Sequence, residues 1–393
     1  MRVIGTRALG LRMPIICESD DLTAIICQSL KDAMENEKIV INDGDIIGVT
    51  EAVVARSQGN YATLDQIAAD VKENFGGGHV GVVFPILSRN RFAMLLKGIS
   101  RGAEKITVLL NYPGDEVGNQ LISWDDVDDK KLNPYSDCLS ETEYRRLFGK
   151  EIGHRFTGID YVDYYKSLGS NIEIIFCADP KRILDYTGQV IAADIHTRAR
   201  TKRALSLAGA KKVIGIDDLL TKSVGGSGYN GQFGLLGSNK ATEEKVKLFP
   251  RDCDAFVYKM QQALRDLFGK TLELLVYGDG CFKDPVGGIW ELADPVVAPA
   301  FTSGLKGTPN ELKLKYLADN NYADLSREDA RKEIEKAIQA KAGIDQKGRM
   351  EAEGTTPRQI TDLLGSLCDL ISGSGDKGTP VVLIQGYFDN YAS

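Results

Sequence analysis

The feature that most constrains the fold is a regular alternation of apolar strands and helices in the middle of the chain. Residues 80–84 and 105–110 are β-rich apolar runs, and residues 89–101 between them have helical spacing. This alternation predicts a parallel βαβ unit, because parallel neighbours need a crossover connection. The same pattern returns between residues 171 and 216. We therefore expect an α/β module in the middle of the chain.

Two more buried strands are predicted far apart in the sequence, at residues 45–50 and 272–276. Asp279 follows the second of them and lies between Gly278 and Gly280. Ligand-binding groups in α/β sheets gather at the carboxyl ends of strands. Asp279 is therefore a candidate ligand for Mg²⁺ or Mn²⁺ bridged to phosphates, since hard cations prefer oxygen ligands. The alternative interpretation is that Asp279 simply occupies a tight turn.

Length and charge restrict the class of protein. The 393 residues exceed the usual length of one domain, so two or three domains are expected. A hydrophobic content of 43% with 26% charged residues is ordinary for a soluble globular protein. The formal net charge of −7 disfavours a nucleic-acid binder, which normally carries a basic face. We expect small-molecule partners and no nucleic acid.

The cysteines and histidines restrict the compartment and the metal. Seven cysteines are scattered without CxxC pairs, which predicts free thiols in a reducing cytoplasm. Three histidines are too few and too dispersed for a histidine zinc site. No apolar run reaches the roughly 20 residues of a membrane span, and the first residues lack the pattern of a signal peptide. The predicted location is cytoplasmic, without membrane contact.

Four other segments have recognisable patterns. Residues 89–91 contain two arginines, Arg89 and Arg91, and this segment is a candidate to bind an anionic substrate, with Arg89 expected at the substrate pocket. The acidic run at residues 123–129 is typical of a solvated loop. Residues 76–78 are three glycines, but they have neither the spacing of a dinucleotide-binding loop nor a Walker lysine. Helical spacing over residues 61–73 predicts an amphipathic helix that ends at these glycines.

The order of several short motifs along the chain resembles the coenzyme F-420-0:γ-glutamyl ligase family. The motifs are MPIICESDDL from residue 13, GDIIGVTE from residue 44, ARSQG from residue 55, VYGDGCFK from residue 276 and GDKGTPVVLIQG from residue 375. The resemblance covers residues 1–60 and 228–393. It implies a mixed α+β and α/β fold with a ligase-like core at residues 1–79 and 228–393. Residues 80–227 are then an α/β insertion relative to shorter family members.

The resemblance also implies a chemistry. Members of this family form an amide bond at the expense of GTP, and the nucleotide of this protein is left open between GTP and ATP. The acceptor carboxylate is activated as an acyl phosphate, which the amine of L-glutamate or a similar amino acid then attacks. Such a reaction needs a nucleotide pocket, Mg²⁺ or Mn²⁺, and basic groups for an anionic acceptor. The acceptor is left open between a deazaflavin precursor, a folate-type acceptor and another acid. The family resemblance further implies a homodimer.

Five residues are expected on the nucleotide side of the site. Arg56 and Ser57 stand where the family has a Ser-Lys pair and would contact phosphates. Gly234, Ser238 and Asn239 belong to a segment that resembles the family's nucleotide-binding loop. Each assignment has an alternative from the residues alone. Arg56 is otherwise an exposed basic residue at a strand end, and the segment from Gly234 is otherwise a flexible loop between domains.

The metal and acceptor sides of the site match the family less closely. Asp279 is the metal ligand that the resemblance implies, and Lys283 and Asp376 are expected at the substrate pocket. However, Leu236 occupies the position of a second metal-binding aspartate, and leucine cannot coordinate a hard cation. Asp217, in a Gly-Ile-Asp triplet, is a candidate replacement. The catalytic acid or base is not identified from the sequence.

Two classes of function therefore stay open. The first is a nucleotide- and metal-dependent amide ligase. The second is a non-catalytic nucleotide or small-molecule binding protein or sensor on the same scaffold, and Leu236 is its main support. The position of other carboxylates separates the two, because a second carboxylate near Asp279 would restore the missing ligand.

Overall fold

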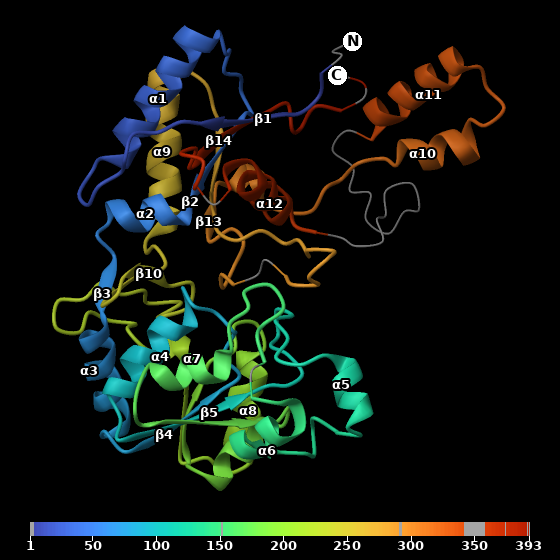
Figure 1. Cartoon of the computed structure of the whole chain (residues 1–393). Helices are drawn as coiled ribbons and strands as arrows, with labels where there is room; N and C mark the ends of the chain where they lie inside the picture. The colour runs from blue at the N-terminus through green and yellow to red at the C-terminus, as the bar shows by residue number, and fades with distance from the viewer. Residues whose placement is uncertain are drawn as a thin grey trace.

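The structure, a computed structural model, describes residues 4–150, 152–290, 293–341, 358–373, 375–390 and 392. Figure 1 shows two lobes, with both ends of the chain in the upper lobe and the middle of the chain in the lower lobe. The fold mixes α and β elements in both lobes. The upper lobe is called the core lobe below, and the lower lobe is called the module.

A five-stranded sheet organises the core lobe. Its strands, in spatial order, are β1 (Arg7–Leu11), β14 (Val381–Gln385), β2 (Ile46–Thr50), β12 (Glu273–Tyr277) and β13 (Ala300–Phe301). The strands predicted at residues 45–50 and 272–276 are confirmed as β2 and β12, which pair in parallel with Thr50 opposite Tyr277. The other pairs in this sheet are antiparallel. Segments from the two ends of the sequence therefore share one sheet.

Helices cover both faces of this sheet, because its strands alternate their apolar side chains between two cores. One core joins Ile47 and Val49 of β2 to helices α1 (Leu22–Glu37) and α9 (Cys253–Phe268). The other joins Ile46 to helix α12 (Ile360–Ser372). A glycine at position 48 is required by the approach of α12, since a Cβ there would lie 2.4 Å from the Cys368 Sγ.

The module contains a six-stranded sheet that is parallel except at one edge. Its strands, in spatial order, are β6 (Leu139–Ser140), β7 (Ile172–Phe176), β5 (Lys105–Leu110), β4 (His79–Val83), β8 (Gln189–Ala192) and β9 (Lys212–Gly215). The predicted βαβ unit is confirmed, because β4 and β5 pair in parallel and helix α4 (Phe92–Arg101) connects them. Whether residues 80–227 are an insertion relative to shorter family members stays a prediction.

The remaining helices of the module cover its sheet. They are α3 (Leu64–Phe75), α5 (Trp124–Asp129), α6 (Glu141–Phe148), α7 (Tyr161–Ser167), α8 (Arg198–Leu207) and the 3₁₀ turns η1 (Pro180–Asp185) and η2 (Ile216–Asp218). The loop predicted at residues 123–129 is wrong, because Ser123 and Asp126 form a capping box that starts α5. The helix predicted from residue 61 starts later, because residues 61–63 form strand β3.

A small antiparallel sheet lies between the lobes. It consists of β10 (Asn239–Thr242), β11 (Lys245–Lys247) and β3 (Tyr61–Thr63). Helix α3 follows β3 directly and packs against α4 of the module, where Gly98 allows close contact with Ile67. Figure 1 shows β3 and β10 at the junction of the two lobes. Two segments that are far apart in the sequence thus cross between the lobes side by side.

Helix α2 (Glu51–Ser57) contacts β2, and the turn η3 (Ser303–Leu305) contacts β12. The core lobe also has a helical extension, which comprises α10 (Leu314–Tyr316), a π-helical turn η4 (Leu317–Asn321) and α11 (Arg327–Ala340). In Figure 1 α10 and α11 project to one side of the five-stranded sheet. Within the residues that the structure describes, we find no helix with the length and apolar character needed to cross a bilayer.

Candidate functional site

Two adjacent parallel strands of the core lobe place acidic residues at the same edge of the sheet. Strand β2 ends at Thr50, and Glu51 follows as the first residue of α2. Strand β12 ends at Tyr277, opposite Thr50, and Asp279 lies two residues farther on. The carboxyl ends of parallel strands are the usual location of ligand-binding groups in such sheets. This edge is therefore the candidate site.

The loop that carries Asp279 is held by side chains rather than by regular secondary structure. The Asp294 carboxylate accepts a hydrogen bond of 2.8 Å from the Asp279 amide. The next amide, that of Gly280, donates to Asp369 on α12 at 3.1 Å. Gly278 has no room for a side chain, because a Cβ there would lie 2.4 Å from the Asp294 Oδ2. The glycines of this motif thus allow the loop to lie directly against Asp294.

Arg91 reaches this loop from the module. It is the N-cap residue of α4, and its guanidinium binds Asp294 at 2.6 Å and Asp279 at 2.9 Å. The Asp294 side chain is 2% exposed and the Asp279 side chain 16%, so the three groups form a largely buried cluster. Burial alone would lower the pKa of Arg91, but the carboxylates of Asp294 and Asp279 outweigh it and raise that pKa. Arg91 therefore stays charged.

A second ion pair lies beside this cluster. Lys247 of β11 binds both carboxylate oxygens of Glu51, at 2.7 and 2.9 Å. Burial is the main reason that the pKa of Glu51 is raised, and the nearby charge of Asp294 adds to it, while Lys247 opposes it. The site thus combines three carboxylates with two cations, one of which comes from the module and one from the small sheet between the lobes.

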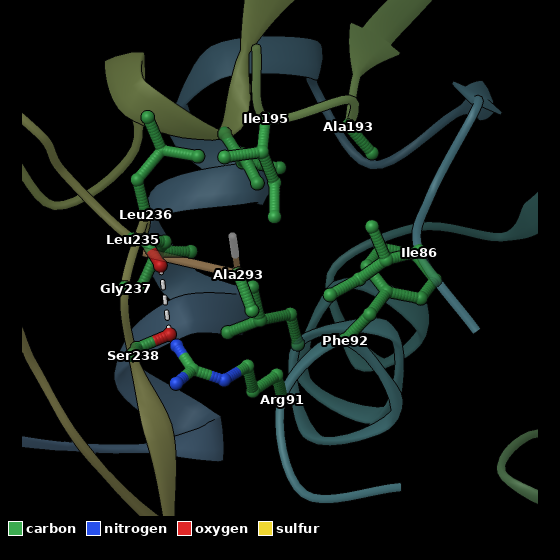
Figure 2. Close-up of a pocket in the computed structure, with 12 residues that line it drawn as sticks. Ile86, Arg91, Phe92, Ala193, Ile195, Leu235, Leu236, Gly237, Ser238 and Ala293 are labelled. Carbon is green, nitrogen blue, oxygen red and sulfur yellow. Dashed lines mark hydrogen bonds between the residues drawn. The ribbon is translucent and has the colours of Figure 1, made fainter. Parts of the chain in front are cut away.

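A small apolar cavity adjoins Arg91 on the side of the module (Figure 2). Its volume is about 20 Å³, which is room for little more than one water molecule. Leu236 lines this cavity, and its side chain is buried in the apolar core of the module. Ser238 also lines it and donates a hydrogen bond to the Leu235 carbonyl at 2.7 Å. Leu236 therefore has a packing role at the position where the family resemblance implies an aspartate.

The other residues predicted on the nucleotide side lie around the lobe junction. Arg56 is exposed at the opposite end of α2 from Glu51, and the Ser57 hydroxyl donates to the Val54 carbonyl. Gly234 adopts a positive φ of 53° and packs closely against the backbone of residues 217–219. Asn239 starts β10, where it pairs with Lys247. Of the five, Ser238 lies beside Arg91, and no contact in the structure tests a nucleotide-binding role.

The residues predicted at the substrate pocket and as the second metal ligand are more dispersed. Lys283 lies over the ring of Trp290, with 5.6 Å between the Nζ and the ring centroid. Asp376 is exposed in the turn before β14, and Arg89 is exposed in the loop before α4. Asp217 is in η2 of the module, where it pairs with Arg198 at 2.7 Å. The structure brings neither Asp217 nor Arg89 to the Arg91 cluster, and their roles stay predictions.

The donor set at the site can be compared with the needs of a hard metal ion. Within the described ranges, no group of three or more His, Cys, Asp or Glu side chains is arranged to hold a metal. Magnesium is commonly bound by only one or two carboxylates, with phosphate oxygens and water completing its octahedron. Asp279 and Asp294 supply two such carboxylates, and both bind the Arg91 guanidinium here. Asp279 and Asp294 are thus of the residue type that binds magnesium, and each also binds a protein partner here.

Sequence reasoning assigned no role to three residues of the site, which are Glu51, Asp294 and Lys247. Glu51 lies inside one of the quoted motifs, but a glutamate at a helix start is also an ordinary capping residue. Arg91 belongs to the predicted anion-binding segment at residues 89–91, and the structure shows that Arg91 contacts the two aspartates while Arg89 is exposed. Asp294 and Lys247 lie in segments without a recognisable motif. Their role depends on contacts across the lobes, which periodicity does not encode.

The comparisons with known proteins agree with the motifs. Among known protein families, the one described as F420-0:Gamma-glutamyl ligase matches residues 10–386. The match runs through the module as well as the core lobe. In a comparison with curated proteins, nothing matches the chain. Because the family match extends over nearly the whole chain, the protein belongs to the F420-0:gamma-glutamyl ligase family, and ligation is the general class of its activity.

Proposed function

We propose that this protein is a nucleotide- and divalent-metal-dependent amide ligase that joins L-glutamate, or a similar amino acid, to a small acidic acceptor. The observation that carries the proposal is the cluster of Asp279, Asp294 and Arg91 at the carboxyl ends of β2 and β12. The cluster combines two carboxylates for a hard cation with a permanently charged guanidinium. Family membership supports the ligase class.

The proposed reaction has two steps. An oxygen of the acceptor carboxylate attacks the γ-phosphorus of GTP or ATP, and the bond to the β-phosphate oxygen breaks, which releases the nucleoside diphosphate. The amine of glutamate then attacks the carbonyl carbon of the acyl phosphate. Phosphate leaves with the electrons of the C–O bond, and the amine loses a proton. We assign no residue as the acid or base, because neither the sequence nor the cluster singles one out.

The residues of the site have distinct proposed roles. Asp279 and Asp294 would hold Mg²⁺ or Mn²⁺, which neutralises charge on the transferring phosphoryl group when bound. Arg91 orients both carboxylates and offers a cation to an anionic group nearby. Arg56, Ser57, Gly234, Ser238 and Asn239 are proposed for the nucleotide, and Lys283, Asp376 and Arg89 for the acceptor. Asp217 could act as a metal ligand only after a rearrangement that separates it from Arg198.

Trapping of the acyl phosphate tests the proposed reaction. The protein is incubated with GTP or ATP, Mg²⁺ or Mn²⁺, and candidate acids, with hydroxylamine in place of glutamate. Hydroxamate formation and release of nucleoside diphosphate are expected together, and glutamate should replace hydroxylamine with release of phosphate. Omission of the acid is the control and should abolish both products. Failure of the protein to bind nucleotide with either metal would refute the proposal.

Replacement of Asp279 by Asn tests the site residue. Asp279→Asn preserves shape and removes charge, so most of the divalent-dependent affinity for nucleotide should be lost. The free energy of unfolding should fall by no more than about 2 kcal/mol, because Asp294 still binds Arg91. Asp254→Asn, in the exposed first turn of α9, is the matched control and should change neither quantity. Unchanged metal-dependent binding in Asp279→Asn would show that Asp279 is only a turn residue.

The alternative proposal is a non-catalytic nucleotide or small-molecule binding protein on the same scaffold. The buried packing role of Leu236 favours it, because this position supplies no ligand. The presence of Asp294 beside Asp279 favours the ligase, because it supplies a second carboxylate. A protein that binds nucleotide with metal, but forms no hydroxamate with any acid, would support the alternative.

We further propose a cytoplasmic homodimer that contacts neither membrane nor nucleic acid. All seven cysteines are described and none forms a disulfide, as expected in a reducing compartment. The dimer is proposed from the family resemblance. Light scattering coupled to size-exclusion chromatography tests it, and a monomer mass at micromolar concentration would contradict it.

A further inference from the structure

The module has the strand arrangement of a ligand-binding α/β fold. Numbered in sequence order from β4, its parallel strands have the spatial order 3-2-1-4-5, which corresponds to β7-β5-β4-β8-β9. The chain reverses its direction of travel across the sheet between β4 and β8. Small molecules bind outside the carboxyl ends of the strands at such a switch point. The proposed ligase function uses the core lobe and assigns nothing to this position.

A cavity of about 680 Å³ lies at this edge of the module. This volume is typical of sites for small organic molecules and far exceeds that of the cavity beside Arg91. Its wall includes Phe84, which follows β4, and Asn111, which follows β5, as well as residues of α8. Phe84 has a φ of 56°, a conformation that is costly for a bulky residue and concentrates at functional sites.

One helix start at this edge that could bind an anion, that of α8, is already filled. The amides of Ile195, His196 and Thr197 at the start of α8 donate hydrogen bonds to the Glu116 carboxylate. An internal carboxylate thus occupies the helix end where a ligand phosphate would otherwise bind. The three glycines at residues 76–78 precede β4 rather than follow it, so they lie at the wrong end of the strand for a phosphate loop. Neither feature therefore supplies backbone amides for a ligand phosphate.

Of the other charged groups in the lining, Lys181 pairs with Asp179 at 3.3 Å, so the polar groups that are left define what the cavity can bind. Thr201 donates to Asp194 and is occupied. The Asn111 Oδ1 is buried without a hydrogen-bond partner among the described residues. Arg200 of α8 lines the cavity and has no salt bridge within the part of the chain that the structure describes. The exposed side chain of Tyr135 also lines the cavity. A cation, an amide and aromatic rings together suit an anion that carries a planar ring.

We propose that the module binds a small organic anion with a planar ring in this cavity, with Arg200 on the acidic group and Tyr135 and Phe84 against the ring. The acidic group is a phosphate, as in a mononucleotide, or a carboxylate, as in an aromatic acid. The proposal is independent of ligation at Asp279, because it rests on the module alone.

Calorimetric titration with AMP, GMP and 4-aminobenzoate tests the proposal and separates the two sources of charge. At least one of these probes should bind, and Arg200→Ala should weaken its binding by about tenfold or more. Leu207→Asp places a negative charge at the exposed rim of the cavity and should weaken binding as well. Arg203→Ala, on the same helix but outside the cavity lining, is the matched control and should have no effect.

Two further measurements distinguish binding in this cavity from binding at the proposed active site. Asp279→Asn should bind the same probe with unchanged affinity, since Asp279 is not part of the cavity. Adenosine and inorganic phosphate, which each lack one half of the ligand, should bind more weakly than AMP if AMP is the probe that binds. No binding of any probe at millimolar concentration would overturn the proposal. So would binding that is lost in Asp279→Asn but kept in Arg200→Ala and Leu207→Asp.

Discussion

Replacing Lys247 with methionine should destabilise the protein strongly at pH 8 and much less at pH 5. The Glu51 carboxylate receives both of its hydrogen bonds from Lys247, and the two side chains are 6% and 12% exposed. Lys247→Met keeps most of the side-chain volume but leaves Glu51 buried without a cation. Breaking one partner of a buried pair typically costs about 3–5 kcal/mol, which we expect at pH 8.

The dependence on pH follows from the pKa of Glu51. Burial and the charge of Asp294 already raise that pKa, and removal of Lys247 takes away the group that opposes them. A carboxyl group whose pKa is higher in the folded than in the unfolded state binds its proton more tightly when folded. Its contribution to stability is complete below the unfolded pKa and is lost as the pH rises through the folded value. At pH 5 a larger share of Glu51 is protonated, so the penalty is smaller.

Equilibrium urea unfolding at the two pH values measures this effect. The double variant Lys247→Met/Glu51→Gln removes both charges and should recover much of the stability lost at pH 8, with little remaining dependence on pH. Lys240→Met, which removes an exposed lysine of β10, is the matched control and should cost little. An equal loss at both pH values would refute the reasoning, as would a double variant no more stable than Lys247→Met alone.

Two further predictions concern other parts of the molecule. The pKa of Cys138 is lowered to about 7, first by a hydrogen bond with the Cys177 thiol and then by Arg182, against the effect of burial. Its alkylation by iodoacetamide should therefore rise with pH through a midpoint near 7, and Cys138→Ser, followed by peptide mass mapping, should remove that modification. Gly48→Ala should cost about 1–3 kcal/mol in thermal or urea unfolding, because its Cβ would collide with Cys368. Adding Cys368→Ala should restore much of this loss, and the absence of rescue would contradict the packing argument.

The elements that the sequence predicts well are those in which one periodic pattern determines the structure. The apolar runs of β2, β4, β5 and β12 are short and contain β-branched residues, which favour an extended backbone, and they form buried strands. The run at residues 123–129 was misjudged for a local reason. Its charge pattern suggests a loop, but Ser123 and Asp126 form a capping box that starts a short helix.

The site was predictable only in part, because it is built from both lobes. Asp279 was found since it follows a strand and lies between glycines. Its partners Asp294 and Arg91 are 15 and 188 residues away in the sequence. No spacing rule connects them, because the connection is made by the packing of α4 against the loop after β12. The large cavity was missed for the same reason, since strand order is a property of the assembled sheet.

The position of β14 has a consequence for how the protein is made. This strand lies between β1 and β2, so residues 381–385 are needed to join the N-terminal strand to the rest of the core sheet. The strands of the module's sheet all lie within residues 79–215. This sheet can therefore form before β14 of the core sheet has been synthesised. During synthesis the module can therefore complete its sheet before the core lobe does, although the core lobe contains the N-terminal strand. The edges of β1 and β2 stay unpaired in the meantime, and unpaired strand edges are where nascent chains aggregate.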